Sequence, residues 1–370
     1  MNKTIVTLLI ICFLLVGIAP AFAQVDIHVM FQTGGDMIPA VNFKEEYEAN
    51  NPGITITLEE VPSESLYEKQ MTEFLTGTGS YDLIELYPTW MGDYVPYVEN
   101  LDSFFEKFAD EMNVDDYIEG AQVGFNKWEG SWYAVPYDGD VVIFYYRKDL
   151  FEDPAIMEEF KGIYGRDLQV PNTWDEVLDC AEFFTRDNFA GQDKFYGIAM
   201  IASRHWWAVG YWSSVYRSFG GEFFDENGEI ALNREAFIKA NEIWAEMIRF
   251  APPGVLNFGY TETKEALASG QVAMALQWAT TVFVDPRQSQ VHDRLGFAVM
   301  PGVLQEDGSI YRTPALACGK CLAIPKSAKN KEEAFKFAAF LSSPEVQVWS
   351  TVNGTGIDPN RYSVLEDPRV

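Results

Sequence analysis

The sequence has 370 residues, of which 48% are hydrophobic and 22% charged, and its formal net charge at pH 7 is −28. A chain of this length and apolar content can bury the cores of two domains of ordinary size. Its acidic residues are spread along the chain and repel phosphate backbones and anionic lipid, which argues against binding to nucleic acid or to a membrane surface.

The first 23 residues have the pattern of an export signal. Lys3 precedes an apolar run, and residues 21–23 read Ala-Phe-Ala, the small-residue spacing of a cleavage site. The run is short for a membrane anchor. Cys12 lies inside it and not at its end, which argues against a lipid attached to that cysteine. We expect cleavage after Ala23 and an exported, periplasmic protein.

Strands alternate with helices in the first part of the mature chain. Apolar residues alternate with threonines in the run that begins at Ile54, which predicts a half-buried strand. Ser65 and Glu68 have the spacing of a capping box before an apolar helical stripe. The predicted series is strand 25–31, a helix from 39 that stops at 50–53, strand 54–61, helix 65–76 and strand 81–86. This order predicts parallel strands with helices on their faces.

The second part repeats this alternation. The stretch "VVIFYY" at 141–146 is apolar and β-branched or aromatic, which predicts a strand buried on both faces, and "YDGD" precedes it. Thr173 and Glu176 form a second capping box. Further predicted elements are helices at 173–184, 233–248, 262–270 and 330–343 and a strand at 271–278.

Three cysteines remain after the signal: Cys180, Cys318 and Cys321. The C-x-x-C pair has the spacing of a redox pair or of half a zinc site, but there is no second such pair and the three histidines are isolated. We therefore expect no metal and no cofactor. In an exported protein we expect Cys318 and Cys321 to form a disulfide and Cys180 to be a buried helix residue.

Five stretches occur in an order that resembles a known family: "VVIFYYRKDLF", "VPNTWDEVLDCAEFF", "GGEFFDENGEIALNREAFIKANEIW", "EALASGQVAMALQW" and "LAIPKSAKNKEEAFKFAAFLSSPEVQ". The family is that of the extracellular solute-binding proteins of ABC importers, in the carbohydrate-binding group related to maltose-binding protein. The resemblance implies an α/β fold with two lobes, joined by crossing strands around a ligand cleft. It also implies docking at a membrane permease, without catalysis.

The two α/β runs and the resemblance together suggest a domain organisation. We expect a signal peptide at 1–23, an N-terminal lobe of 24–135 plus 297–343, and a C-terminal lobe of 136–296 plus 344–370. We expect a monomer. Members of the family usually continue well beyond a segment like "DPNRYSVLEDPRV", so the resemblance implies that the sequence is truncated and that the second lobe lacks part of its packing.

A sugar or polyol exposes apolar C–H faces and hydroxyl groups, so its site needs aromatic platforms with donors and acceptors. Strand ends present ligand-facing loops in α/β lobes, and the residues before a crossing strand lie at the edge of the cleft. By position at strand ends, at the crossing or in the late segments, the candidate ligand-binding residues are Gln32, Glu85, Tyr87, Trp90, Tyr137, Asp138, Trp207, Trp278, Gly319 and Arg361.

Individual candidates carry specific expectations. The resemblance implies that Trp278 stacks on the ligand. Tyr137 can stack and donate, and Asp138 can accept from two hydroxyls, although "YDGD" also reads as an ordinary turn. Gly319 brings backbone close to the ligand, and Arg361 either donates to hydroxyls or pairs with an acid.

We expect the substrate-binding component of an ABC transporter, which captures a sugar or polyol for a membrane permease. Two alternatives stay open. A secreted glycoside hydrolase would use two of the many carboxylates. A polyamine or other cationic-ligand binding protein of the same fold would pair Glu85, Asp138 and Asp140 with ammonium groups. A ferric-ion binder is a further alternative because of the tyrosines at 145–146.

Overall fold

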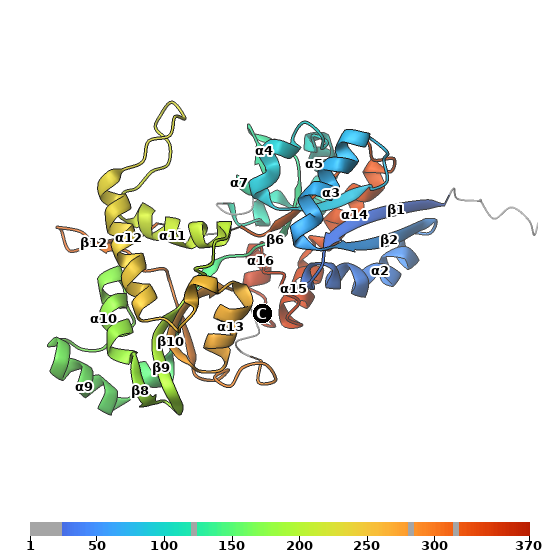
Figure 1. The fold of residues 1–370 in the computed structure, drawn as a ribbon. Coiled ribbons are helices and arrows are strands. Elements are labelled where there is room, and N and C mark those ends of the chain that lie inside the picture. Colours follow the sequence, from blue (N-terminus) through green and yellow to red (C-terminus); the bar gives the residue numbers. More distant parts are fainter. Residues whose placement is uncertain (1–23, 120–123, 280–284, 314–317) are drawn as a thin grey trace, which may run out of the picture.

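The computed structural model describes residues 24–119, 124–279, 285–313 and 318–370. The described residues form two α/β lobes side by side (Figure 1). Each lobe has its own five-stranded sheet, in the orders β2-β1-β3-β14-β6 and β11-β7-β10-β9-β8. The mixed α/β architecture with two lobes confirms the predicted fold class. The predicted signal peptide lies outside the described residues.

The first lobe is built on a sheet that begins with parallel strands. Its strands are β1 (Val25–Gln32), β2 (Ile54–Val61), β3 (Leu83–Leu86), β6 (Val135–Asp138) and β14 (Lys320–Ala323). β1 pairs in parallel with β2 and β3, as the alternation of strands and helices predicted, and β14 runs antiparallel to β3 and β6. A small hairpin of β4 (Lys127–Trp128) and β5 (Ser131–Trp132) lies beside them.

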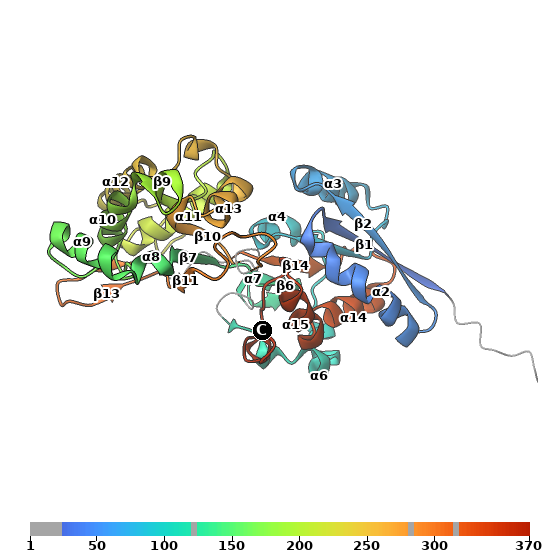
Figure 2. The same cartoon turned by 90° about the horizontal axis from the view of Figure 1, so that it is seen from below.

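Helices cover both faces of the first sheet, with α3 on one face and α2 and α14 on the other (Figure 2). The helices of this lobe are η1 (Gly35–Met37), α2 (Ile38–Asn50), α3 (Ser63–Thr76), η2 (Pro88–Trp90), α4 (Met91–Tyr94), α5 (Asp102–Lys107), α6 (Ala109–Met112), η3 (Val114–Asp116), α7 (Gly124–Asn126), α14 (Lys331–Leu341), α15 (Pro344–Val352) and α16 (Tyr362–Leu365). Two buried apolar clusters, one on each face, form the core.

The second lobe has the strands β7 (Val142–Arg147), β8 (Arg186–Phe189), β9 (Gln192–Ala199), β10 (Val272–Trp278) and β11 (Leu295–Ala298). All seven residues of β10 are buried, because β7 and β9 flank this strand and helices cover it. Its helices are α8 (Lys148–Phe151), α9 (Pro154–Tyr164), α10 (Trp174–Phe184), α11 (Trp206–Ser218), α12 (Arg234–Arg249), η5 (Val255–Asn257) and α13 (Tyr260–Ala268). The hairpin of β12 (Val303–Leu304) and β13 (Ile310–Tyr311) adjoins α10 through a bridge between Thr173 and Gly302.

The chain crosses between the sheets at positions that differ from the expected boundaries. We expected the first crossing before residue 136, but β6 pairs with β14 in the first sheet, so the crossing comes after Asp138. We expected the return near residue 297, but β11 pairs with β7 in the second sheet, and Arg312 still contacts Asn172 of the second lobe. The first sheet resumes only at Lys320. Strand pairing between distant residues sets these boundaries.

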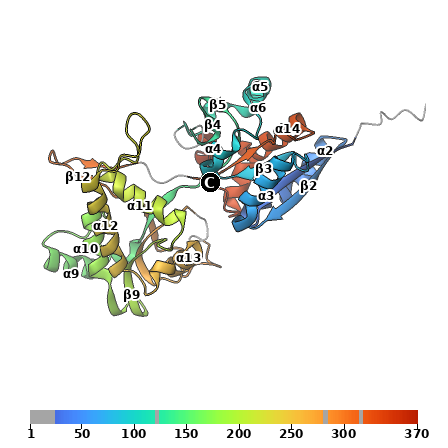
Figure 3. The ribbon, with the colours of Figure 1, turned by 45° about the horizontal axis from the view of Figure 1, so that its top comes forward.

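The C-terminal segment was expected in the second lobe, but its described residues pack on the first. Val346 of α15 and Ile357 are buried in the same apolar cluster as Phe43 of α2. Figure 3 shows the red C-terminal helices beside the blue strands of the first lobe. The apolar face of α15 therefore completes the core of the first lobe.

The expected disulfide is absent, since Cys180, Cys318 and Cys321 are all free and buried. Cys318 packs with the core of the second lobe, whereas Cys321 packs between β3 and α4 in the first. Gly319, with a φ of +65°, turns the chain between them, and the two side chains pack into different apolar clusters instead of facing each other. Cys180 is the buried helix residue that we expected.

Candidate ligand-binding cleft

A cavity of about 380 Å³ lies between the two lobes. The first lobe contributes Gln32, the loop 33–36, Tyr87, Lys320 and the loop 355–356. The second lobe contributes Trp207, Tyr260, Trp278 and Ala279, and the crossing segments contribute Asp140 and Cys318. The volume falls in the range of small-molecule sites, and both lobes are needed to form it.

Strand ends bring several of these side chains together. Gln32 ends β1, and Tyr87 directly follows β3, its parallel neighbour. Parallel strands end at the same edge of a sheet, so the two residues meet there. In the second lobe, Trp278 ends β10 and faces the same space.

Aromatic side chains form the wall of the cavity that belongs to the second lobe. The rings of Trp207 and Trp278 lie 6.5 Å apart at 71°, and Tyr211 supports Trp278 edge-on at 5.8 Å. Trp278 is only 5% exposed, whereas Trp207 is half-buried. The packing of Trp278 therefore fixes its ring, and this wall offers a pre-organised apolar face to a ligand.

A buried ammonium group and its carboxylates form the floor. Lys320 Nζ lies 3.2 Å from Asp36 Oδ1, 3.1 Å from Asp138 Oδ2 and 3.8 Å from Asp140 Oδ2. Burial by itself would lower the pKa of Lys320, but the three carboxylates outweigh it and raise that pKa well above its usual range. Lys320 is therefore a charged donor at the floor of the cavity.

The carboxylates themselves are held at different depths. Asp138 is buried and also accepts a 2.9 Å hydrogen bond from the backbone N–H of Asp358. Asp140 lines the cavity, and 22% of its side chain is exposed. Burial and the neighbouring Asp138 raise the pKa of Asp140 well above its usual value, against the opposing effect of Lys320.

Gln32 connects the floor to the strand behind it. Its backbone N–H donates to Glu85 Oε2 at 2.7 Å, its side-chain N–H donates to Asp36 Oδ2 at 3.3 Å, and Tyr87 donates its hydroxyl to Gln32 Oε1 at 2.6 Å. Glu85 is fully buried, and burial, followed by the charge of Asp36, raises the pKa of its carboxyl well above the usual value. These bonds fix the side chain of Gln32 at the cavity surface.

Of the ten predicted residues, four line the cavity: Gln32, Tyr87, Trp207 and Trp278. Glu85 and Asp138 lie behind it and contact lining residues. Trp90 packs edge-on against Tyr87 at 5.0 Å.

Three other predicted residues have structural contacts. Tyr137 is completely buried and donates to the backbone oxygen of Asp36 at 2.5 Å, which excludes the expected stacking on a ligand in this structure. Gly319 packs against the backbone of Asp138. Arg361 is buried against Ser342 and Tyr117 of the first lobe and does not line the cavity.

The sequence argument missed several lining residues, chiefly Lys320, Asp36, Tyr260 and Thr355. Lys320 lies between the two cysteines of the C-x-x-C pair, and in this stretch we considered only the cysteines, as a redox pair, a zinc site or a disulfide. A lysine that opens a buried strand was the available signal, because lysine is rarely buried without a partner. The loop that contains Thr355 belongs to the late segment that we expected to return to the cleft, although Arg361 of that segment does not reach it.

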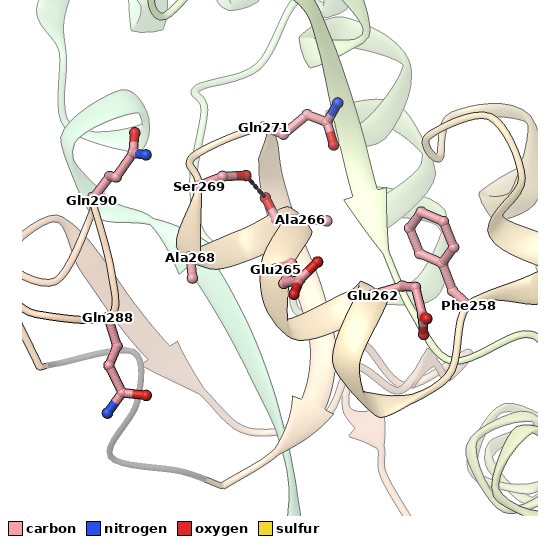
Figure 4. A pocket seen from close by; sticks show the side chains of 9 residues that line it. All are labelled: Phe258, Glu262, Glu265, Ala266, Ala268, Ser269, Gln271, Gln288 and Gln290. Carbon is pink, nitrogen blue, oxygen red and sulfur yellow. Dashed lines mark hydrogen bonds between the residues drawn. The ribbon is translucent and has the colours of Figure 1, made fainter.

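A second hollow, of about 510 Å³, lies on the second lobe around α13 (Figure 4). Glu262 and Glu265 of α13 and Gln288 and Gln290 of the loop before β11 line it, with Phe258 at one side. Its lining comes from one lobe and lacks the paired aromatic rings of the inter-lobe cavity. We therefore place the candidate site between the lobes.

In the described part of the chain, no cluster of three or more histidine, cysteine, aspartate or glutamate side chains is suited to hold a metal ion. The same part of the chain contains no helix long and apolar enough to cross a membrane.

Two α/β lobes around a cavity with an aromatic wall and a polar floor define the class of two-lobed solute-binding proteins. The chain belongs to the bacterial extracellular solute-binding protein family, whose model matches residues 38–348. This result confirms the family that the ordered sequence stretches resembled.

Among curated proteins, the chain is 25% identical to a probable amino-acid ABC transporter periplasmic-binding protein of Sinorhizobium fredii, over 86% of this chain and 68% of that protein. It is 26% identical to the mannitol-binding protein of Pseudomonas aeruginosa, over 83% of this chain and 66% of that protein. The chain thus spans about two thirds of the length of these relatives.

Solved structures show the same fold. The maltose-bound MalE3 of T. maritima superposes with a TM-score of 0.75 at 24% identity, covering 93% of this chain and 84% of that chain. A solute-binding protein from Agrobacterium radiobacter K84 in complex with ribitol gives a TM-score of 0.77 at 22% identity, covering 94% and 83%.

Proposed function

We propose that this protein captures a sugar or polyol between its lobes and delivers it to the membrane permease of an ABC importer. The inter-lobe cavity carries the proposal, because a wall formed by Trp207 and Trp278 faces a floor of charged and polar groups around Lys320. Such a cavity matches a ligand with apolar C–H faces and many hydroxyls.

The comparisons support polyols in particular. Relatives are named as mannitol-binding and erythritol/L-threitol-binding proteins, and one structural neighbour holds ribitol. In our proposal Trp278 and Trp207 contact the carbon chain, and Gln32, Tyr87, Asp140 and Lys320 contact hydroxyls. Glu85 and Asp138 do not contact the ligand in this proposal; Glu85 positions Gln32, and Asp138 positions Lys320.

The site and the comparisons give less support to the two alternatives, a glycoside hydrolase and a polyamine-binding protein. The family and its structural neighbours are binding proteins, which gives no support to a glycoside hydrolase. A polyamine would be attracted by the carboxylates of the floor, but Lys320 already pairs with Asp36 and Asp138 and repels a second ammonium group. We propose an exported, periplasmic protein, in line with the extracellular family and with a relative named as a periplasmic-binding protein. We also propose that it is a monomer.

A calorimetric titration tests the proposed site after a thermal-shift screen of polyols, sugars and polyamines. We expect Trp207→Ala to lose about ten-fold in affinity for the best ligand, because it removes an aromatic contact. Trp128→Ala is the matched control, since Trp128 is an exposed tryptophan of the hairpin formed by β4 and β5 and does not line the cavity. Equal affinities of the two variants would contradict the site, and a polyamine as the best ligand would contradict the ligand class.

A further inference from the structure

Lys320 has a donor that the protein does not use fully. An ammonium group has three N–H donors. Asp36 Oδ1 and Asp138 Oδ2 lie within hydrogen-bond distance of Nζ, at 3.2 Å and 3.1 Å. Asp140 Oδ2 lies at 3.8 Å, beyond the reach of a direct hydrogen bond. One donor of Lys320 therefore remains for another oxygen.

Asp140 is the complementary acceptor. It lines the cavity, and 22% of its side chain is exposed, whereas Asp138 has no exposed side-chain surface. Within the described residues no hydrogen bond reaches the Asp140 carboxylate, although its backbone oxygen accepts one from Cys318. On the cavity floor, an unused N–H donor of Lys320 thus lies beside the Asp140 carboxylate, which attracts Lys320 at 3.8 Å but accepts no hydrogen bond from the described residues.

We infer that Lys320 and Asp140 together make the site specific for a hydroxyl group. Lys320 needs a ligand atom that accepts a hydrogen bond, Asp140 needs a ligand group that donates one, and a hydroxyl does both. The oxygen of a hydroxyl accepts a hydrogen bond from Lys320 Nζ, and its O–H donates a hydrogen bond to Asp140 in the same contact. The separation of 3.8 Å leaves both atoms within reach of one such oxygen. This inference rests on the proposed function of the cavity.

Charged groups fit this pair less well than a hydroxyl. A ligand carboxylate can accept from Lys320, but it cannot donate to Asp140 and is repelled by Asp36, Asp138 and Asp140. A ligand ammonium can donate to Asp140 and is attracted by the three carboxylates, but it cannot accept from Lys320, which repels it. We therefore expect the site to prefer neutral polyols to sugar acids strongly, and to amino polyols by a smaller margin.

Three probes with the same number of carbon atoms test the preference: sorbitol, gluconate and glucamine, which differ at one terminal group. Titrations at about pH 8 keep a carboxyl group of raised pKa more fully ionised. We expect the unmodified protein to bind sorbitol at least ten-fold more tightly than gluconate, and to bind glucamine with an affinity between the two. Equal binding of all three would overturn the inference.

Asp140→Asn tests the residue itself, because it keeps the shape and removes the charged acceptor. We expect it to lose about 10- to 100-fold in sorbitol affinity and to narrow the gap between sorbitol and gluconate. Asp358→Asn is the control: it removes a carboxylate near Asp138 from a residue that does not line the cavity. We expect it to change sorbitol affinity less than three-fold, on the order of an indirect charge effect.

Equal losses in the two variants would assign the effect to overall charge and overturn the inference. If none of the three probes binds the unmodified protein while another sugar binds in the screen, the inference fails and the proposed function stands. If no sugar or polyol binds at all, the proposed function fails as well.

Discussion

Arg361 and Lys320 are both buried cations, and their partners give them different roles. The guanidinium of Arg361 donates to the backbone oxygens of Ser342 and Met112 at 2.8 and 3.0 Å and lies 3.8 Å from the ring centre of Tyr117. It also pairs with Asp116 at 3.4 Å, which is the second of its two expected roles. At the scale of the residue, Arg361 holds the C-terminal segment on the first lobe, whereas Lys320 has a donor directed at the cavity.

Glu85 gives a prediction on pH at the same scale. Its native pKa lies above the ordinary value of 4.5, so the native state holds a proton that the unfolded state releases between these two values. Stability from this group is present below pH 4.5 and is lost as the pH rises through the native pKa. We expect the free energy of unfolding to fall as the pH rises from 4.5 toward the native pKa, by up to ~1.4 kcal/mol per pH unit for this group.

Glu85→Gln should flatten that dependence, as measured by denaturant unfolding at several pH values. Glu226→Gln removes the same carboxyl group from an exposed turn that follows Phe224, and it should leave the slope unchanged. The same slope in both variants would show that Glu85 does not cause the pH dependence.

At the scale of the element, two similar capping patterns had different outcomes. Thr173 and Glu176 form the predicted capping box at the start of α10, with Thr173 Oγ1 accepting from the N–H of Glu176 at 3.2 Å. Ser65 and Glu68 do not, because α3 begins earlier, after Pro62, and places Ser65 inside its first turn. There Ser65 Oγ donates to the backbone oxygen of Pro62 at 3.2 Å instead.

This difference predicts unequal costs of alanine substitution. Thr173→Ala should lower the free energy of unfolding by about 1 kcal/mol, because it leaves an N–H of the first turn without its acceptor. Ser65→Ala removes a hydroxyl from an exposed helix position and should change stability by less than ~0.5 kcal/mol. Denaturant unfolding of both variants measures the costs, and a larger cost for Ser65→Ala would contradict the observed caps.

Helix α12 shows how packing sets the rotation of an element. In the sequence, five apolar residues of the predicted helix 233–248 follow helical spacing and predict one buried stripe: Phe237, Ala240, Trp244, Met247 and Ile248. The buried residues are Ala236, Ala240, Ile243 and Met247, and Phe237 is 41% exposed. The helix and its length were predicted correctly, but contacts with α10 and α11 bury a neighbouring face.

At the scale of the whole molecule, two crossing segments connect the lobes and touch each other. The N–H of Cys318 donates to the backbone oxygen of Asp140 at 3.0 Å. Gly319 has a φ of +65°, and a Cβ at this position would lie 2.0 Å from the backbone oxygen of Asp138. Only glycine fits this position well, because the positive φ disfavours other residues and because a side chain would collide with the backbone of Asp138.

Gly319→Ala should therefore destabilise the protein and weaken ligand binding. Gly77→Ala is the matched control, because Gly77 has a similar φ of +61° but no atom within 4 Å of its added Cβ. We expect Gly319→Ala to cost about 1–3 kcal/mol more than Gly77→Ala, since only the former forces backbone apart. Unfolding and titration of both variants measure the difference, and equal costs would mean that the crossing adapts freely.

The sequence by itself determined the features that depend on neighbouring residues. Apolar periodicity predicted β1, β2 and β3 and their parallel order, and the strand-end rule found Gln32, Tyr87 and Trp278 at the cavity. These patterns are local, because a side chain's face in a strand or helix depends on its spacing from its neighbours.

Only the tertiary structure decided which distant residues meet. Lys320 joins Asp36 across 284 positions and Asp138 across 182, and no local pattern marks either pair. The tertiary structure also decided the reverse case: Cys318 and Cys321 are close in sequence, but they pack into the cores of different lobes. Burial of a charge requires a partner, and the return path of the chain determines which partner is available.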